Sequence, residues 1–193
     1  TCSHGNVVVI SDCIEQEIEW QYTRKLSTPE GEREWQIHTV SAPEDEVYLV
    51  IGNTGIHAPT STQVEKVAKM LEKYPERMNE IETIGIIARR GIKSLLHGDY
   101  EAVGRAMSEN QLMLQSIGVS SPELERLIQA AIPTSLGAKL TGAGGGGCMV
   151  ALTRDPKATS EAIELAGGRT IISKFGANGL NLDEGHEALF WKI

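Results

Sequence analysis

The sequence has few cysteines, and those present follow no motif. Cys2, Cys13 and Cys148 are an odd number at unrelated spacings among 193 residues, which argues against a disulfide framework and against a zinc site. We expect reduced thiols. The histidines are equally scattered, and none pairs with another at a metal-ligand spacing such as i, i+4, so the sequence predicts no protein-bound metal on imidazole ligands.

The sequence also lacks a basic cluster and a long apolar run. The net charge is −8 and Lys and Arg form no stripe, so no nucleic-acid partner is expected. No window approaches the roughly 18 consecutive apolar residues of a membrane span, and the N-terminus has neither a basic region nor an apolar signal core. We therefore expect no membrane partner and a cytoplasmic location. The hydrophobic fraction of 40% is enough for the core of one compact domain.

A glycine-rich stretch at residues 139–152 is the most informative part of the chain. Apolar residues flank the glycines on both sides, which predicts strand, glycine loop, strand. A tight turn needs one or two glycines, and ordering five within residues 142–147 costs roughly 0.5 to 1 kcal/mol each relative to alanine. Because glycine adopts positive φ freely, such a run lets several backbone N–H groups converge on one anion. We therefore favour a phosphate loop over a flexible hairpin turn, although the run matches neither the P-loop nor the dinucleotide-binding pattern.

The rest of the sequence predicts an α+β protein. Strands are expected at residues 6–12, 14–22 and 35–40, in an antiparallel ribbon that continues into residues 47–52. Helical spacing predicts one helix capped at Thr60, Ser61 or Thr62, two more at residues 76–96 and 100–116, and a fourth that begins at Pro122 with Ser120 or Ser121 as its cap. After the glycine loop, a helix at residues 156–166 precedes strands at 169–175 and 188–193, an order that matches half of a ferredoxin-like sandwich.

Three other parts of the sequence, one segment, one residue pair and one cysteine, each allow two interpretations. Residues 53–62 form either a simple strand-to-helix loop with a cap, which these residues alone favour, or part of a binding site. Asn110 and Gln111 are either a polar pair on a solvated helix face or ligand contacts. Cys148 follows the glycine loop, but because it begins an apolar strand we expect a packed residue rather than a reactive thiol.

The glycine stretch resembles the third signature motif of the GHMP kinases, the family of galactokinase, homoserine kinase, mevalonate kinase and phosphomevalonate kinase. Within that family, Lys-Leu-Thr-Gly-Ala-Gly-Gly-Gly-Gly-Cys at residues 139–148 is most similar to the motif of the mevalonate kinases. Residues 53–60 resemble their Asn-Thr-Gly-x-x-x-x-Thr segment, with Thr60 at the matching threonine, and residues 107–119 resemble one of their helical elements. The resemblance runs from about residue 5 to residue 183.

The resemblance implies a small-molecule kinase that uses ATP and Mg²⁺. Its reaction would be phosphorylation of the mevalonate 5-hydroxyl in isoprenoid biosynthesis, with mevalonate and ATP as small-molecule partners. Thr60, Ala143 and Gly144 are the implied substrate-binding residues. The implied nucleotide-binding residues are Thr141, Gly142, Ala143, Gly144, Gly145, Gly146 and Gly147. Two alternatives stay open: another kinase of the family, acting on phosphomevalonate or homoserine, or a non-catalytic ligand-binding module of the same fold. A homodimer is also left open.

The resemblance further implies that this chain is the C-terminal part of the enzyme. In these kinases the main ATP loop, the Mg²⁺-linked acidic residue and the catalytic aspartate belong to the N-terminal half, so no catalytic residue and no metal ligand is assigned here. The chain begins without methionine, and the aspartate is expected upstream of Thr1. The expected regions are residues 1–52, strands that continue from a ribosomal S5-like N-terminal domain, and residues 53–193, the GHMP kinase C-terminal domain with a ferredoxin-like antiparallel sheet and helices. The N-terminal half is then the expected protein partner.

Overall fold

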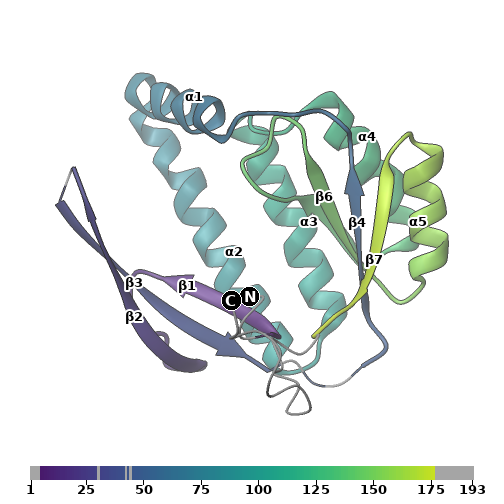
Figure 1. Ribbon diagram of the computed structural model, residues 1–193, viewed down its shortest axis with the longest axis horizontal. Helices are drawn as coiled ribbons and strands as arrows, with labels where there is room; N and C mark the ends of the chain where they lie inside the picture. Colours follow the sequence, from purple (N-terminus) through teal and green to yellow (C-terminus); the bar gives the residue numbers. More distant parts are fainter. Residues whose placement is uncertain (1–4, 30, 42, 44, 177–193) are drawn as a thin grey trace, which may run out of the picture. The chain divides into compact units, whose positions relative to one another are not determined.

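The computed structural model describes residues 5–29, 31–41, 43 and 45–176, and these form two compact units. The first holds residues 5–41 together with Gly176, and the second holds residues from Pro43 to Phe175. Each unit has its own antiparallel sheet (Figure 1). Within the described ranges, none of the helices has both the length and the apolar character that a membrane span requires.

The first unit is a three-stranded sheet in the order β1-β3-β2. Its strands are β1 (Val7–Ser11), β2 (Glu19–Thr28) and β3 (Gly31–Val40). The predicted ribbon of three strands is confirmed here, although the second strand begins at Glu19 rather than at Ile14. Ile37 and Val40 are buried, and the buried imidazole of His38 accepts a hydrogen bond from the Glu15 N–H through Nε2 at 3.0 Å.

The second unit contains a four-stranded antiparallel sheet in the order β5-β6-β4-β7. Its strands are β4 (Tyr48–Asn53), β5 (Gly137–Leu140), β6 (Cys148–Thr153) and β7 (Arg169–Lys174). The prediction that residues 47–52 continue the first ribbon is wrong, because β4 lies between β6 and β7. Its nearly continuous apolar run suits a central strand, whereas β2 and β3 of the first sheet contain many polar residues between their apolar ones. The two compact units divide before β4, whereas the regions expected from the sequence meet between residues 52 and 53, at the last residue of β4.

Helices connect and cover these strands. They are α1 (Thr60–Lys73), α2 (Met78–Leu96), α3 (Tyr100–Ser116), α4 (Pro122–Ala131) and α5 (Pro156–Leu165), with short 3₁₀ turns η1 (Pro75–Arg77) and η2 (Ile132–Thr134). Ser121 caps α4 as predicted, since its hydroxyl accepts the Leu124 N–H. No side chain caps α1, where Pro59 and not a hydroxyl residue stands at the N-cap. The predicted cap at Thr60, Ser61 or Thr62 is therefore wrong.

The main core lies between the four-stranded sheet and the pair α4 and α5, which stand side by side in Figure 1. Leu124, Leu127 and Ile128 of α4 and Ile163 of α5 are almost fully buried against the sheet. Burying each such side chain contributes about 1.5 to 3 kcal/mol. The sheet supplies Val50, Ala138, Leu140, Met149 and Ala151.

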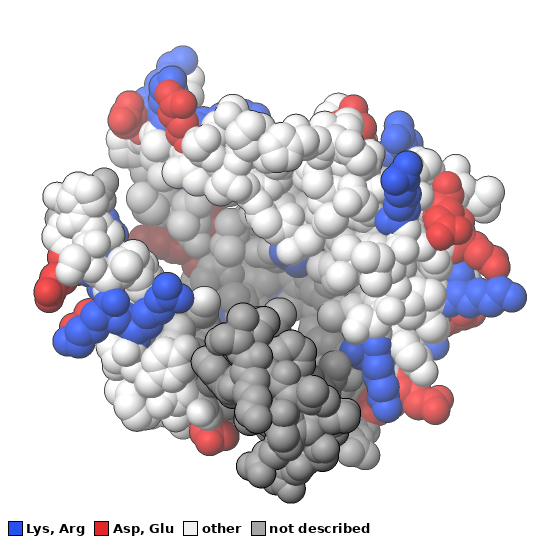
Figure 2. Space-filling model, in the orientation of Figure 1, with Lys and Arg blue, Asp and Glu red and all other residues white. Residues whose placement is uncertain are grey.

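A contact between two glycines sets α3 against the edge strand β5. A Cβ atom added at Gly104 of α3 would lie 2.2 Å from the Leu136 carbonyl oxygen, and one added at Gly137 would lie 1.9 Å from the Gly104 carbonyl oxygen. The two backbones therefore touch directly, and α2 packs against the far side of α3. On the face shown in Figure 2, Lys and Arg alternate with Asp and Glu and form no continuous basic patch.

Candidate functional site

The glycine loop joins β5 to β6 through residues Thr141 to Gly147. All five of its glycines have positive φ: 78° at Gly142, 85° at Gly144, 74° at Gly145, 156° at Gly146 and 74° at Gly147. A side chain at these angles would strain the backbone, so the loop requires glycine at each position. The strand, loop, strand arrangement predicted from the sequence is confirmed.

Three N–H groups of the loop already have partners in the protein, the first being the Thr141 N–H, which donates to the Cys148 carbonyl at 3.0 Å. The Gly145 N–H donates to the Val119 carbonyl at 2.7 Å, and the Gly147 N–H donates to the Ile56 carbonyl at 2.8 Å. The Gly147 carbonyl in turn accepts both the N–H and the hydroxyl of Thr54 at 2.9 Å. These bonds attach the loop to the segment after β4 and to the segment between α3 and α4.

Close packing gives Gly144, Gly145 and Gly146 a further reason to be glycine, which the sequence did not reveal, and a Cβ at Gly146 would lie 2.8 Å from the Ile56 carbonyl oxygen. A Cβ at Gly144 would lie 2.0 Å from the Val119 carbonyl oxygen, and a Cβ at Gly145 would lie 2.3 Å from Nε2 of Gln63. By contrast, nothing lies within 4 Å of a Cβ at Gly142 or at Gly147. Part of the glycine run is thus explained by protein packing rather than by a ligand.

The remaining amides of the loop are the ones available to an anion. Within the described residues, the N–H groups of Gly142, Ala143, Gly144 and Gly146 have no hydrogen-bond partner. Unpaired backbone N–H groups are unfavourable unless water or a ligand accepts from them, and several in one loop form a concavity that suits an anion. Thr141 and Gly142 are exposed, so the site is open to solvent at that end.

Gln111 of α3 holds the start of the loop, so of its two interpretations the solvated helix face is wrong. It is only 4% exposed, and its Oε1 accepts the Leu140 N–H at 2.9 Å. Its Nε2 donates to Glu125 at 2.6 Å and to Ser120 at 3.2 Å. The sequence did carry a signal, because Gln111 shares helical spacing with Met107 and Leu114, which are half-buried, and this places it on the inward face.

The first turn of α1 lies beside the loop. Gln63 approaches Gly145, and with Val64, Val67, Val119 and Ala143 it lines a cavity of about 240 Å³. Thr60 is the first residue of this helix and is exposed. A helix N-terminus presents unpaired N–H groups that favour negative charge, and the first turn of α1 carries no acidic residue.

Lys139 is the cation nearest to the loop in the sequence, and it is half-buried on β5. Its ammonium donates to the Leu140 carbonyl at 2.7 Å. Burial lowers the pKa of this ammonium below its ordinary value, because desolvation disfavours the charged form. Cys148 is a half-buried free thiol at the start of β6.

Residues 92–166, which run from the end of α2 through the glycine loop to α5, match the family described as GHMP kinases C terminal. The chain contains a GHMP kinase C-terminal domain. Mevalonate kinase from Pyrococcus furiosus is 36% identical over 150 residues, which are 74% of this chain and 45% of that protein. Mevalonate kinase from Thermococcus onnurineus is 37% identical over the same shares. The chain thus spans about half the length of the curated relatives it matches.

Solved structures show the same fold. The mevalonate kinase of L. major in complex with R-mevalonate aligns with a TM-score of 0.64 at 28% identity, over 74% of this chain and 47% of that one. The phosphomevalonate kinase of Streptococcus pneumoniae aligns with a TM-score of 0.63 at 19% identity, over 73% of this chain and 43% of that one, which supports the fold alone. The predicted α+β class of the GHMP kinase C-terminal domain is confirmed.

Proposed function

We propose that this chain is the C-terminal part of a mevalonate kinase, an enzyme that moves the γ-phosphoryl group of ATP to the mevalonate 5-hydroxyl. The glycine loop carries this proposal, because its four unpaired N–H groups occur in a sequence motif most similar to that of the mevalonate kinases. The identity of 36% and 37% to two proteins named mevalonate kinase supports the same substrate. The first unit of the structure is then assigned to the N-terminal domain of that enzyme.

Phosphoryl transfer needs mainly positioning and neutralisation of charge. We assign phosphate binding to the N–H groups of Gly142, Ala143, Gly144 and Gly146, with the Thr141 hydroxyl as a further donor at the mouth of the loop. Gly145 and Gly147 were predicted to bind phosphate as well, but their N–H groups hold the loop in place. Thr60, with Ala143 and Gly144, is assigned to the border of the substrate site, where the first turn of α1 meets the loop.

The Mg²⁺ ion that the family implies finds no ligand set in this part of the chain. The described residues contain no group of three or more His, Cys, Asp or Glu side chains that could hold a metal. We therefore assign no Mg²⁺ ligand and no catalytic base to them, and propose that the N-terminal half supplies both. That half, ATP and mevalonate are the proposed partners.

The test is a coupled ADP-release assay on the full-length protein that contains this chain. We expect turnover with mevalonate, and none with phosphomevalonate, homoserine or galactose. Turnover with one of those three in place of mevalonate would identify a different kinase of the family. Absence of turnover with all four, from a protein that still binds ATP by calorimetry, would leave the ligand-binding module as the function.

The loop itself is tested by a matched pair of glycine variants. Gly142 and Gly176 have φ of 78° and 75°, and a Cβ at either position meets no atom closer than 3.7 Å, so alanine introduces the same backbone strain at both. Gly142→Ala should weaken ATP binding by tenfold or more in calorimetry, about 1.4 kcal/mol, because it disturbs the phosphate-binding amides. Gly176→Ala should leave ATP affinity within about twofold of the unmodified protein. Equal effects of the two variants would contradict the assignment.

A further inference from the structure

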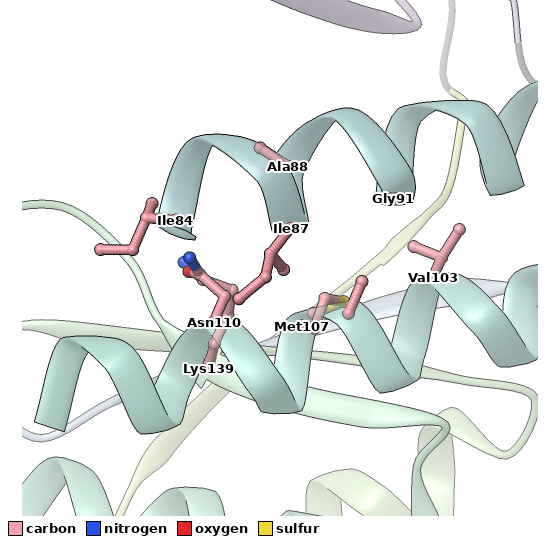
Figure 3. A pocket seen from close by; sticks show the side chains of 9 residues that line it. Ile84, Ile87, Ala88, Gly91, Val103, Met107, Asn110 and Lys139 are labelled. Carbon is pink, nitrogen blue, oxygen red and sulfur yellow. The ribbon is translucent and has the colours of Figure 1, made fainter. Parts of the chain in front are cut away.

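A cavity of about 340 Å³ opens between α2 and α3 with β5 at one side. Its walls are almost entirely apolar, and Figure 3 shows the side chains that line it. The apolar residues are Ile84, Ile87, Ala88, Gly91, Val103, Ala106 and Met107. The volume lies near the lower end of the range for small-molecule sites, so the cavity suits a small ligand.

Asn110 and Lys139 are the polar side chains of this lining, and in Figure 3 both run toward the same end of the cavity. The Lys139 ammonium has three donors, of which one reaches the Leu140 carbonyl. Among the described residues no carboxylate pairs with Lys139, and the Asn110 amide has no hydrogen-bond partner. A desolvated ammonium without a counter-ion is unfavourable, and a bound anion would remove that penalty.

We propose that this cavity binds a small amphiphilic monoanion, a carboxylate with a short alkyl chain. Its head would accept hydrogen bonds from the Lys139 ammonium and the Asn110 amide, and its alkyl chain would lie between Ile84, Ile87 and Met107. One unpaired positive charge matches one carboxylate charge, whereas a phosphate monoester would leave close to one negative charge unbalanced in an apolar site. The site does not depend on the proposed kinase reaction, because its ligand is not a reactant.

Octanoate is the probe, titrated below its micelle concentration into the isotope-labelled 193-residue chain and followed by NMR. We expect saturable shifts of the methyl signals of Ile84, Ile87 and Met107 and of the Lys139 ammonium signal. 1-Octanol has the same chain length without the charge, and it should bind about tenfold more weakly or worse. No saturable shift with octanoate, or equal binding of octanol, would overturn the proposal.

Two variants separate the charge from the shape of the cavity. Lys139→Met keeps most of the stem and removes the ammonium, so octanoate affinity should fall by about tenfold or more. Lys157→Met is the matched control, since this lysine is exposed on α5 with its ammonium 4.0 Å from Glu161, and octanoate affinity should not change. Ala88→Leu fills the cavity from an exposed helical position and should abolish binding, which keeps the test decisive if Lys139→Met does not fold. Unchanged affinity in either cavity variant would contradict the proposal.

Two further ligands test whether the cavity prefers a carboxylate to a phosphate and whether it is separate from the substrate site. Octyl phosphate should bind more weakly than octanoate, and tighter binding would overturn the assignment to a carboxylate. Mevalonate, a carboxylate with two hydroxyl groups and little apolar surface, should not displace octanoate. Displacement by mevalonate would make the cavity part of the substrate site and would overturn the proposal, while leaving the kinase function standing.

Discussion

Gln111 and Lys139 each bond to the backbone of Leu140, and burial has a different energetic consequence for the neutral amide and for the charged ammonium. Gln111 is buried with both amide atoms paired, so it fixes the Leu140 N–H at no electrostatic penalty. Lys139 is half-buried, and among the described residues its ammonium has only the Leu140 carbonyl as partner. The fold explains Gln111, whereas for Lys139 we propose that a bound carboxylate supplies the missing partner.

Replacement of Thr141 by valine tests the hydroxyl at the mouth of the loop. The side chain is exposed and the shape is retained, while the Thr141 N–H still donates to the Cys148 carbonyl. Losing one hydrogen bond to a phosphate should cost about 1.5 to 3 kcal/mol. In the full-length enzyme the ATP affinity should therefore fall about 10-fold to 150-fold.

Thr83→Val is the control for this variant, because the Thr83 hydroxyl donates to the Asn79 carbonyl within α2 and is assigned no ligand. It should leave ATP affinity unchanged. If ATP affinity and turnover rate were unchanged in Thr141→Val, the Thr141 hydroxyl would have no role in phosphate binding, and Thr141 would have only a structural role at the end of β5.

The charge of Lys139 should be visible in the pH dependence of stability. Its folded-state pKa lies below the ordinary value of 10.5, so the unfolded state binds more protons between the folded pKa and 10.5. The desolvation penalty is fully present at neutral pH, and the free energy of unfolding should rise as pH rises through the folded pKa. Lys139→Met should be at least as stable at neutral pH and should lack this rise, as measured by urea unfolding at a series of pH values. A parallel pH dependence of the two proteins would show that Lys139 carries no such penalty.

At the scale of elements, the position of α3 depends on an absence of side chains. Gly104 and Gly137 allow the helix backbone to touch β5, which brings Gln111 within reach of the Leu140 N–H. The glycine loop begins directly after this strand, so α3 places one end of the loop. The segment after α3 places its middle through the Val119 carbonyl.

Gly104→Ala should therefore be strongly destabilising. The new Cβ would lie 2.2 Å from a backbone oxygen, which cannot move aside as a flexible side chain can. Overpacking of this kind costs typically 1 to 3 kcal/mol or more, which should appear as a lower urea midpoint and weaker ligand binding. Gly85→Ala is the matched control in α2, where the Cβ would meet only the end of Arg89 at 3.6 Å, and it should be neutral or stabilise by up to about 1 kcal/mol. Equal stability of the two variants would contradict the close contact.

The sequence predicted local features better than distant contacts. The helix at residues 100–116, the Ser121 cap and the strands around the glycine loop were all predictable, since periodicity and capping chemistry are local. The sheet partners of β4, the hydrogen-bond partner of the Gln111 Oε1 and the occupied amides of Gly145 and Gly147 were not. Each of these is decided by a partner far along the chain, such as the Ile56 carbonyl for Gly147, which no local pattern encodes.

At the scale of the whole molecule, the two units have separate sheets and separate buried residues. The second unit holds the main core and every residue of the glycine loop, α1 and the cavity between α2 and α3. We expect a fragment of residues 43–175 to keep its fold, with cooperative urea unfolding and the same octanoate-induced methyl shifts as the 193-residue chain. Non-cooperative unfolding of this fragment would show that the second unit requires the first.

The attachments of the glycine loop also determine when the loop can acquire its shape during folding. The Thr54 hydroxyl and the Gly147 carbonyl that it contacts are 93 residues apart, and Val119 and Gly145 belong to different elements. Contacts of such separation form late, because the entropy of closing the chain between them must be overcome first. Secondary structure should thus recover during refolding before the ability to bind an anion does, and a newly made chain should form its helices before its glycine loop.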